Sequence, residues 1–181
     1  MNLQELKQLE NQIAELKEVS TKHNLDLNEV LKNLEQKVNE IKTHLNENME
    51  VWDKIQLSRI QQRPTTLDFI HHIFDDFIEL HGDRLYGEDP ALVSGIATFE
   101  GMPITVLGNQ KGQNTKDNIY PRFGMSQPEG YRKALRIMQQ ANKFNRPIVT
   151  FINTPGAFPG REAEERGQSH TIGHNLPEMA S

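Results

Sequence analysis

The chain has 181 residues, enough for one domain and an additional segment. It has no cysteine, which excludes disulfides and thiolate metal sites. Because no long apolar run and no basic-then-apolar leader occur, we expect a soluble cytoplasmic protein without a membrane segment. The net charge of -5 argues against nucleic acid as a main partner.

Two apolar stripes at spacings of three and four residues predict a pair of helices near the N-terminus. The first stripe lies within residues 1–19 and the second within residues 30–45. Ser20–Asn24 separates them, and Asp26 with Glu29 has the spacing of a capping box for the second helix. We expect a helical hairpin that packs on itself or on a partner.

A proline-containing break predicts a boundary between this helical extension, residues 1–62, and a domain over residues 63–181. Apolar residues at helical spacing then predict a helix over residues 66–80. In the polar turn that follows, we expect Asp83 to pair with Arg84.

Two apolar runs, residues 93–99 and 104–107, predict a β-hairpin. Residues 108–124 predict a long polar loop, and such loops are usually functional. Residues 109–136 hold six basic and two acidic residues, a charge of +4 that favours an anionic ligand. The basic residues are Lys111, Lys116, Arg122, Arg132, Lys133 and Arg136. Alternatively, Arg132, Lys133 and Arg136 form the solvent-facing side of the next helix.

A further helix has its own start signal, with Ser126 and Glu129 at capping-box spacing and Pro128 in the first turn. Its apolar side extends to Phe144. The apolar run at residues 148–152 then predicts a strand covered on both faces.

A loop with two glycines and two prolines follows this strand at Thr154–Gly160, and a helix begins near Arg161 or Glu162. A strand-loop-helix step of this kind directs backbone N–H groups towards a guest in the loop, and a carbonyl or carboxylate oxygen is the natural guest. The alternative is an ordinary connection in an α/β protein.

The last helix should cross back to a further parallel strand, and none is found before Ser181. We therefore expect a domain truncated at its C-terminus. Gly173 and Pro177 weaken this helix, by roughly 1 and 3 kcal/mol in a helix interior.

Six blocks of sequence carry a resemblance to a known family. They are VWDKIQLSRIQQRPTTLDFI, ELHGDR, GNQKGQNTKDN, FGMSQPEGYRKALR, TFINTPGAFPG and AEERGQS. In this order they resemble the carboxyltransferase alpha subunits of bacterial acetyl-CoA carboxylase, over most of residues 51–181. The resemblance implies an α/β, crotonase-like domain of ββα repeats, incomplete here, after the helical hairpin.

The resemblance also implies a reaction. With a homologous beta subunit, in a heterotetramer of two alpha and two beta subunits, such proteins transfer carboxylate from carboxybiotin to acetyl-CoA. The biotin carboxyl carrier protein presents the carboxybiotin, biotin carboxylase belongs to the wider ATP-dependent complex, and malonyl-CoA is the product for fatty acid synthesis. No metal and no side-chain nucleophile is implied, because backbone N–H groups stabilise the oxyanions, each by roughly 3 to 4 kcal/mol.

The matching TPGA-Y/F-PG motif implies site residues in this chain. It places the loop Thr154–Gly160 beside carboxybiotin, with the backbone N–H groups of Gly156 and Ala157 as catalytic donors. The substrate-binding residues implied on the carboxybiotin side are Gln110, Lys111, Gly112, Thr154, Phe158 and Gly160.

Several positions depart from the family pattern. Asn153 stands where the family usually has aspartate, and His170, Gly173 and Pro177 replace residues that favour helices more. The glycine-rich segment of the alpha-subunit oxyanion hole is expected beyond Ser181, so we expect this chain alone to be inactive.

The histidines suggest a metal site as an alternative interpretation of the chain. His170 and His174 are four apart on a predicted helix, as in zinc peptidases, but no glutamate lies between them and no third ligand is evident. His71 and His72 are adjacent, point in different directions, and are expected at the surface.

Two other readings keep the fold. In one, the chain is a non-catalytic scaffold or interaction fragment that binds partners without turnover. In the other, it is a hydratase or hydrolase whose acid or base would be Glu162, Glu164 or Glu165. We interpret these glutamates instead as first-turn residues that complement the helix dipole.

Overall fold

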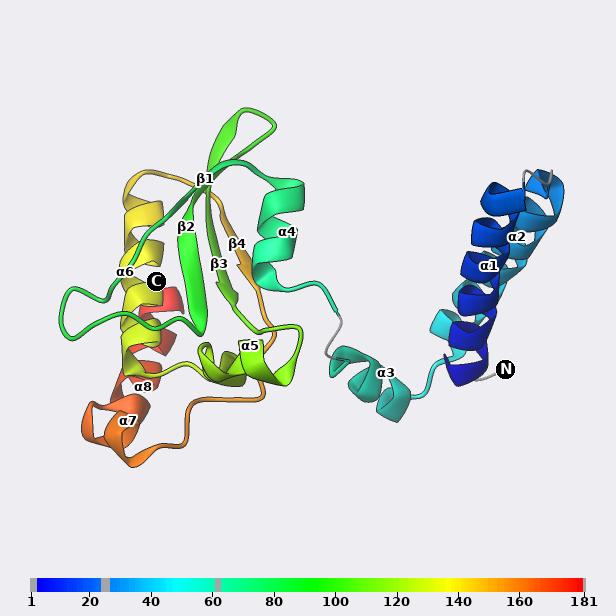
Figure 1. Cartoon of the computed structure of the whole chain (residues 1–181). Coiled ribbons are helices and arrows are strands. Elements are labelled where there is room, and N and C mark those ends of the chain that lie inside the picture. The colour runs from blue at the N-terminus through cyan, green and yellow to red at the C-terminus, as the bar shows by residue number, and fades with distance from the viewer. Residues whose placement is uncertain (1–2, 24–26, 61–62, 181) are drawn as a thin grey trace. The chain divides into compact units, whose positions relative to one another are not determined.

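A computed structural model describes residues 3–23, 27–60 and 63–180 (Figure 1). The chain divides into two compact units, residues 1–59 and residues 60–181. Within the described ranges, no helix has both the length and the apolar character that crossing a membrane requires.

The described part of the first unit is helical: α1 (Leu3–His23), α2 (Asn28–Asn48) and α3 (Val51–Ser58). Ile13 of α1 and Val38 of α2 are buried in one cluster. Partly buried residues surround this pair, namely Leu9, Leu31, Leu34 and Ile41. The apolar stripes therefore pack against each other, and the predicted helical hairpin is confirmed.

The break between these two helices begins later than predicted. α1 continues to His23, so a break that starts at Ser20 is wrong. Ser20–His23 contains no glycine or proline, and its residues cost a helix only a few tenths of a kcal/mol each. The predicted capping box of Asp26 and Glu29 lies partly outside the described residues, because Asp26 is not among them.

The second unit is built on a mixed sheet of four described strands, in the order β1-β2-β3-β4. Its strands are β1 (Asp75–Glu79), β2 (Leu92–Phe99), β3 (Met102–Asn109) and β4 (Ile148–Phe151). β1 and β3 run antiparallel to β2, and β4 runs parallel to β3. The predicted hairpin is confirmed as β2–β3, and its turn residues Glu100 and Gly101 both have positive φ, as a type I′ hairpin turn requires.

The helix predicted over residues 66–80 is wrong in its second half. α4 (Thr66–Ile73) ends at Phe74, whose backbone is extended, and β1 follows. Ile78 pairs with Ile96 of β2, and the Phe77 ring fills the space above Gly95 where a Cβ would overlap it. This pairing with a distant strand outweighs local helical periodicity.

Helices cover both faces of the sheet (Figure 1). Ile70 of α4 packs on one face, where the buried strand residues are Val93, Ala97, Ile104 and Val106. α6 (Pro128–Lys143) lies on the opposite face, and α8 (Gln168–Ala180) packs beside it, with Asn175 Nδ2 donating to Tyr131 O at 2.9 Å. The predicted loop after β3 contains the short helix α5 (Thr115–Ile119) and one 3₁₀ turn, Arg122–Gly124.

Three predictions around α6 and β4 need correction. The N-cap of α6 is Gln127 rather than Ser126, with Pro128 at the start of the helix. Phe144 is 57% exposed because it follows the last helical residue, and its ring lies under Arg146 instead of in the core. Ile148 is 41% exposed because β4 is an edge strand of the described sheet, so this strand is not covered on both faces.

Candidate functional site

The loop Thr154–Gly160 connects β4 to the short helix α7 (Arg161–Glu165), as predicted. The Thr154 hydroxyl accepts a hydrogen bond from Gly156 N–H at 3.1 Å and donates to Gly156 O at 2.9 Å. Gly156 has φ +149, which a side chain would disfavour. A Cβ on Gly160 would overlap the Phe158 ring, so glycine lets this ring fold back over the start of α7.

The backbone donors of this loop are not equivalent. Gly156 N–H is used by Thr154, and Phe158 N–H donates to Ser126 O at 3.0 Å. Ala157 N–H has no acceptor within the described residues. Of the two predicted donors, Ala157 is therefore the one available to a ligand oxygen.

The segment Gln110–Gly112 lies next to this loop, joined through Lys111. Lys111 Nζ is 2.9 Å from Asn153 Oδ1. Gln110 is used structurally, since its Oε1 accepts from Leu67 N at 3.1 Å and its Nε2 donates to Lys111 O at 3.0 Å. Lys111 thus contacts Asn153, the residue that directly precedes the loop Thr154–Gly160.

A strained turn completes the contact between them. Arg122 has φ 46 and Phe123 has φ 56, both rare for residues with a Cβ, and Gly124 follows with φ 76. A Cβ on Gly124 would lie 3.0 Å from Asn153 O and 3.0 Å from Lys111 Cγ. We call residues 110–112, 122–127 and 153–160 the loop junction.

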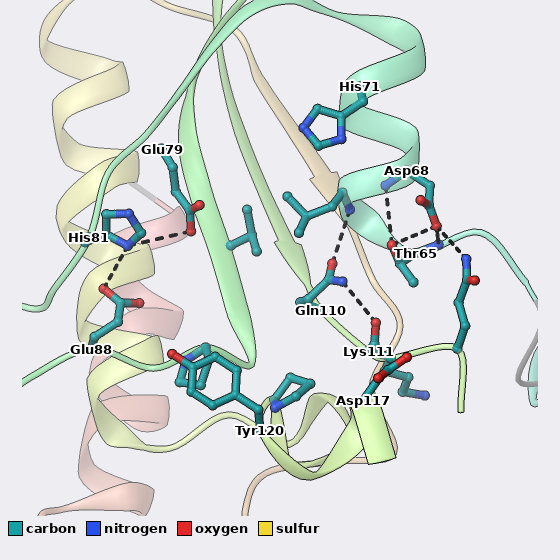
Figure 2. A pocket seen from close by; sticks show the side chains of 16 residues that line it. Thr65, Asp68, His71, Glu79, His81, Glu88, Gln110, Lys111, Asp117 and Tyr120 are labelled. Atoms are coloured by element: carbon teal, nitrogen blue, oxygen red, sulfur yellow. Dashed lines mark hydrogen bonds and ion pairs between the residues drawn. The ribbon is translucent and has the colours of Figure 1, made fainter. Parts of the chain in front are cut away.

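A cavity of about 620 Å³ lies on the α4 side of residues 110–112 (Figure 2). Gln110, Lys111 and Gly112 line it, whereas the predicted residues of the loop Thr154–Gly160 do not. Four carboxylates also line it, those of Asp68, Glu79, Glu88 and Asp117. Because Lys111 is the only lysine or arginine among the described lining residues, the cavity disfavours anions.

Three of the six basic residues between 109 and 136 form ion pairs inside the second unit, so the six make neither one anion site nor one solvent-facing helix side. Lys133 is fully buried and pairs with Glu88. Arg132 Nε is 2.7 Å from Asp83 Oδ2, and Arg122 Nη1 is 3.3 Å from Asp89 Oδ1. Burial of these pairs explains why the local charge of +4 does not become an exposed basic patch.

Asp83 does not pair with Arg84 as predicted. Its Oδ1 accepts the backbone N–H groups of Leu85, Tyr86 and Gly87, and its Oδ2 binds Arg132. Burial alone would raise the pKa of Asp83, but these hydrogen bonds lower it from 3.8 to about 2. At Asp89, burial raises the pKa above 3.8 despite hydrogen bonds from two backbone N–H groups.

The residues of the rival readings lie on exposed surface. The His170 and His174 rings stack with centroids 6.2 Å apart, and the described residues contain no cluster of three or more metal-ligating side chains. Glu165 pairs with Arg161 at 2.7 Å on the exposed side of α7. His71 and His72 are exposed, as predicted.

Sequence reasoning missed Asp89 and the role of Ser126 at the loop junction. Asp89 Oδ2 accepts Gln127 N–H at 2.9 Å, and the Ser126 carbonyl accepts from Phe158 and from Gln168 Nε2. These contacts join residues about 30 to 40 positions apart, so no local pattern signals them.

Solved structures with the same arrangement are carboxyltransferases and carboxylases of acyl-CoA substrates. The beta subunit of geranyl-CoA carboxylase from P. aeruginosa matches with a TM-score of 0.53 at 20% identity, over 68% of this chain and 24% of that one. Transcarboxylase 12S, with hydrolyzed methylmalonyl-coenzyme A bound, matches with a TM-score of 0.50 at 24% identity, over 61% of this chain and 20% of that one. These matches confirm the predicted α/β, crotonase-like fold.

The sequence defines the family within this class. The family model described as "Acetyl co-enzyme A carboxylase carboxyltransferase-like" matches residues 2–181, and the chain belongs to that family. Acetyl-coenzyme A carboxylase carboxyl transferase subunit alpha from Bacillus thuringiensis (strain Al Hakam) is 55% identical over 173 residues, 96% of this chain. The same subunit from Bacillus anthracis (strain CDC 684 / NRRL 3495) matches equally. The chain spans about half the length, 53%, of these curated relatives.

Proposed function

We propose that this chain supplies the carboxybiotin side of an acetyl-CoA carboxylase carboxyltransferase site, as part of an alpha subunit. The reaction transfers carboxylate from carboxybiotin on a carrier protein to acetyl-CoA and yields malonyl-CoA. The observation that carries the proposal is the Ala157 N–H, which lacks an acceptor within the described residues and lies in a loop stiffened by Pro155 and Pro159.

The loop residues have distinct proposed roles. Ala157 N–H donates to the oxygen that becomes negatively charged in the transition state, a contribution of roughly 3 to 4 kcal/mol. Thr154 and Gly156 hold the turn through their mutual hydrogen bonds. Phe158 and Gly160 form one wall, and Gln110, Lys111 and Gly112 form the neighbouring wall. Carboxybiotin, when bound, supplies the carboxyl group and a ureido nitrogen that takes the methyl proton of acetyl-CoA.

The proposed partners follow from the family. We propose a beta subunit as direct partner, in an assembly of two alpha and two beta subunits, with the biotin carboxyl carrier protein and biotin carboxylase in the wider cytoplasmic complex. The names of the curated relatives support the alpha-subunit assignment.

The test is malonyl-CoA formation from acetyl-CoA and carboxybiotin in the presence of the beta subunit. The polypeptide assayed is a chimera of residues 1–181 with the part of a Bacillus relative that the match leaves uncovered, and the intact relative is the control. We expect turnover within tenfold of the control. A chimera that folds and binds the beta subunit without turnover would favour the scaffold alternative.

A further inference from the structure

Asp89 is a fully buried carboxylate next to the loop junction. Its Oδ1 accepts from Ala91 N–H at 3.1 Å and from Arg122 Nη1 at 3.3 Å, and its Oδ2 accepts from Gln127 N–H at 2.9 Å. A Cβ on Gly130 would overlap Oδ2, so glycine admits the carboxylate to the first turn of α6. Asp89 therefore fixes the backbone at residues 126–130.

The same backbone segment holds the loop Thr154–Gly160. Ser126 is 2% exposed, and its carbonyl accepts the N–H of Phe158 at 3.0 Å. Phe158 follows Ala157 directly, so the Ser126–Phe158 bond sets the orientation of the peptide next to the Ala157 donor. Any shift of Ser126 moves this peptide.

Arg122 provides a second connection between Asp89 and the loop. Its guanidinium carbon lies 6.0 Å from the centre of the Phe158 ring, within the range of a cation–π contact. Its backbone has φ 46, an unfavourable conformation for a residue with a Cβ that persists only where surrounding contacts hold it. The Asp89 ion pair is one such contact.

We propose that Asp89 and Arg122 are positioning residues that hold Phe158, and with it the Ala157 N–H, in place for the carboxybiotin side of the reaction. The expected effect on carboxyl-transfer kinetics rests on the proposed function, whereas the expected effect on hydrogen exchange in the loop does not. Asp89→Asn gives one amide N–H₂ in place of an acceptor oxygen, so a backbone or guanidinium donor then faces a donor. Arg122→Gln removes the cation and leaves Asp89 in place.

The matched control is Asp83→Asn. It makes the same chemical change at a buried aspartate. The partners of Asp83 are Arg132 and the backbone N–H groups of residues 85–87, and within the described residues it has no contact with Ser126 or Phe158. The first measurement is amide hydrogen exchange in the 181-residue chain. The exchange rate at Phe158 is divided by that at Val106, a fully buried position in β3, to remove global destabilisation.

We expect this ratio to rise about tenfold in Asp89→Asn and in Arg122→Gln, and not to rise in Asp83→Asn, where global destabilisation alone speeds exchange at Val106. Arg122→Lys, which keeps the ion pair, should recover at least half of the protection. An unchanged ratio in both Asp89→Asn and Arg122→Gln, or an equal rise in the control, would overturn the positioning role.

The second measurement uses the chimera with the beta subunit and follows carboxyl transfer from malonyl-CoA to biocytin. We expect kcat/KM for biocytin to fall about tenfold in Asp89→Asn and Arg122→Gln. In the same variants, KM for malonyl-CoA should stay within twofold of the value for the unmodified chimera. Asp83→Asn should leave both parameters unchanged. Equal kinetics in all variants of an active chimera contradict the proposal. If the chimera is folded and inactive while the exchange ratio still rises, the proposed function fails and the loop-positioning role stands.

Discussion

Buried charges around α6 are the main residue-scale feature of the second unit. Glu129 is 1% exposed and lies 2.6 Å from Arg166 Nε, and Lys133 is fully buried beside Glu88. Such pairs need not stabilise the fold relative to apolar residues, but removal of one partner typically costs 3 to 5 kcal/mol. The pairs therefore constrain which substitutions the region tolerates.

The sign of one pH dependence follows from Asp83. Its pKa is lowered from 3.8 to about 2 in the folded state, so its stabilisation is present above pH 4 and is lost as the pH falls towards 2. A shift of this size corresponds to roughly 2 kcal/mol. Asp83→Asn should therefore reduce the free energy of unfolding by roughly 2 kcal/mol at pH 7, and by progressively less between pH 4 and pH 2.

Urea titrations of the wild-type chain and Asp83→Asn across this pH range measure the difference. Far-UV circular dichroism is the suitable signal, because the only tryptophan, Trp52, belongs to the other unit. A difference that does not depend on pH would contradict the assigned hydrogen bonds.

The sequence alone located the loop Thr154–Gly160 but not the buried ion pairs of the second unit. Thr154–Gly160 was identifiable because proline and glycine spacing is local and the family motif is contiguous. The pairs Asp83–Arg132 and Asp89–Arg122 were not, since their members are 49 and 33 positions apart and only the folded sheet brings them together. Lys133 is 45 positions from its partner Glu88, so its position on the predicted helix suggested a solvent-facing residue instead of a buried one.

At the scale of elements, α4 and β1 show how capping and strand pairing divide one apolar segment. Thr65 and Asp68 form a complete capping box at the start of α4, with Asp68 Oδ2 accepting from Thr65 N–H at 2.7 Å. Seven residues after Asp68, Asp75 begins the pairing of β1 with β2. Periodicity over residues 66–80 could not reveal this switch, because the partner strand lies beyond the segment.

Thr65→Ala should destabilise the second unit by about 1 kcal/mol, because it removes the side-chain acceptor of Asp68 N–H and one hydroxyl donor to Asp68. The control is Thr43→Ala on the exposed surface of α2, where the hydroxyl contacts only Asn39 O among the described residues and the expected change is within 0.5 kcal/mol. Thermal unfolding followed by circular dichroism distinguishes them. Equal changes in the two variants would show that the cap does not stabilise α4.

At the scale of the molecule, the predicted α/β class, hairpin and family all hold. Long ordered motif blocks carried this prediction, and local propensities placed most helices. The strand coverage was wrong because the exposure of β4 depends on its neighbours in the sheet rather than on its own apolar sequence. The family is described as acetyl co-enzyme A carboxylase carboxyltransferase-like, while the chain spans about half the length of its curated relatives. What this half contributes is therefore the central question.

Our central claim is that the Ala157 N–H of this chain serves carboxyl transfer. Ala157→Pro removes that N–H, whereas Ala157→Gly keeps it. In the chimera with the beta subunit, malonyl-CoA formation should fall by about 10²- to 10³-fold in Ala157→Pro and by less than threefold in Ala157→Gly. If Ala157→Pro folds, binds the beta subunit and retains activity within threefold of the unmodified chimera, the oxyanion role of this loop is wrong.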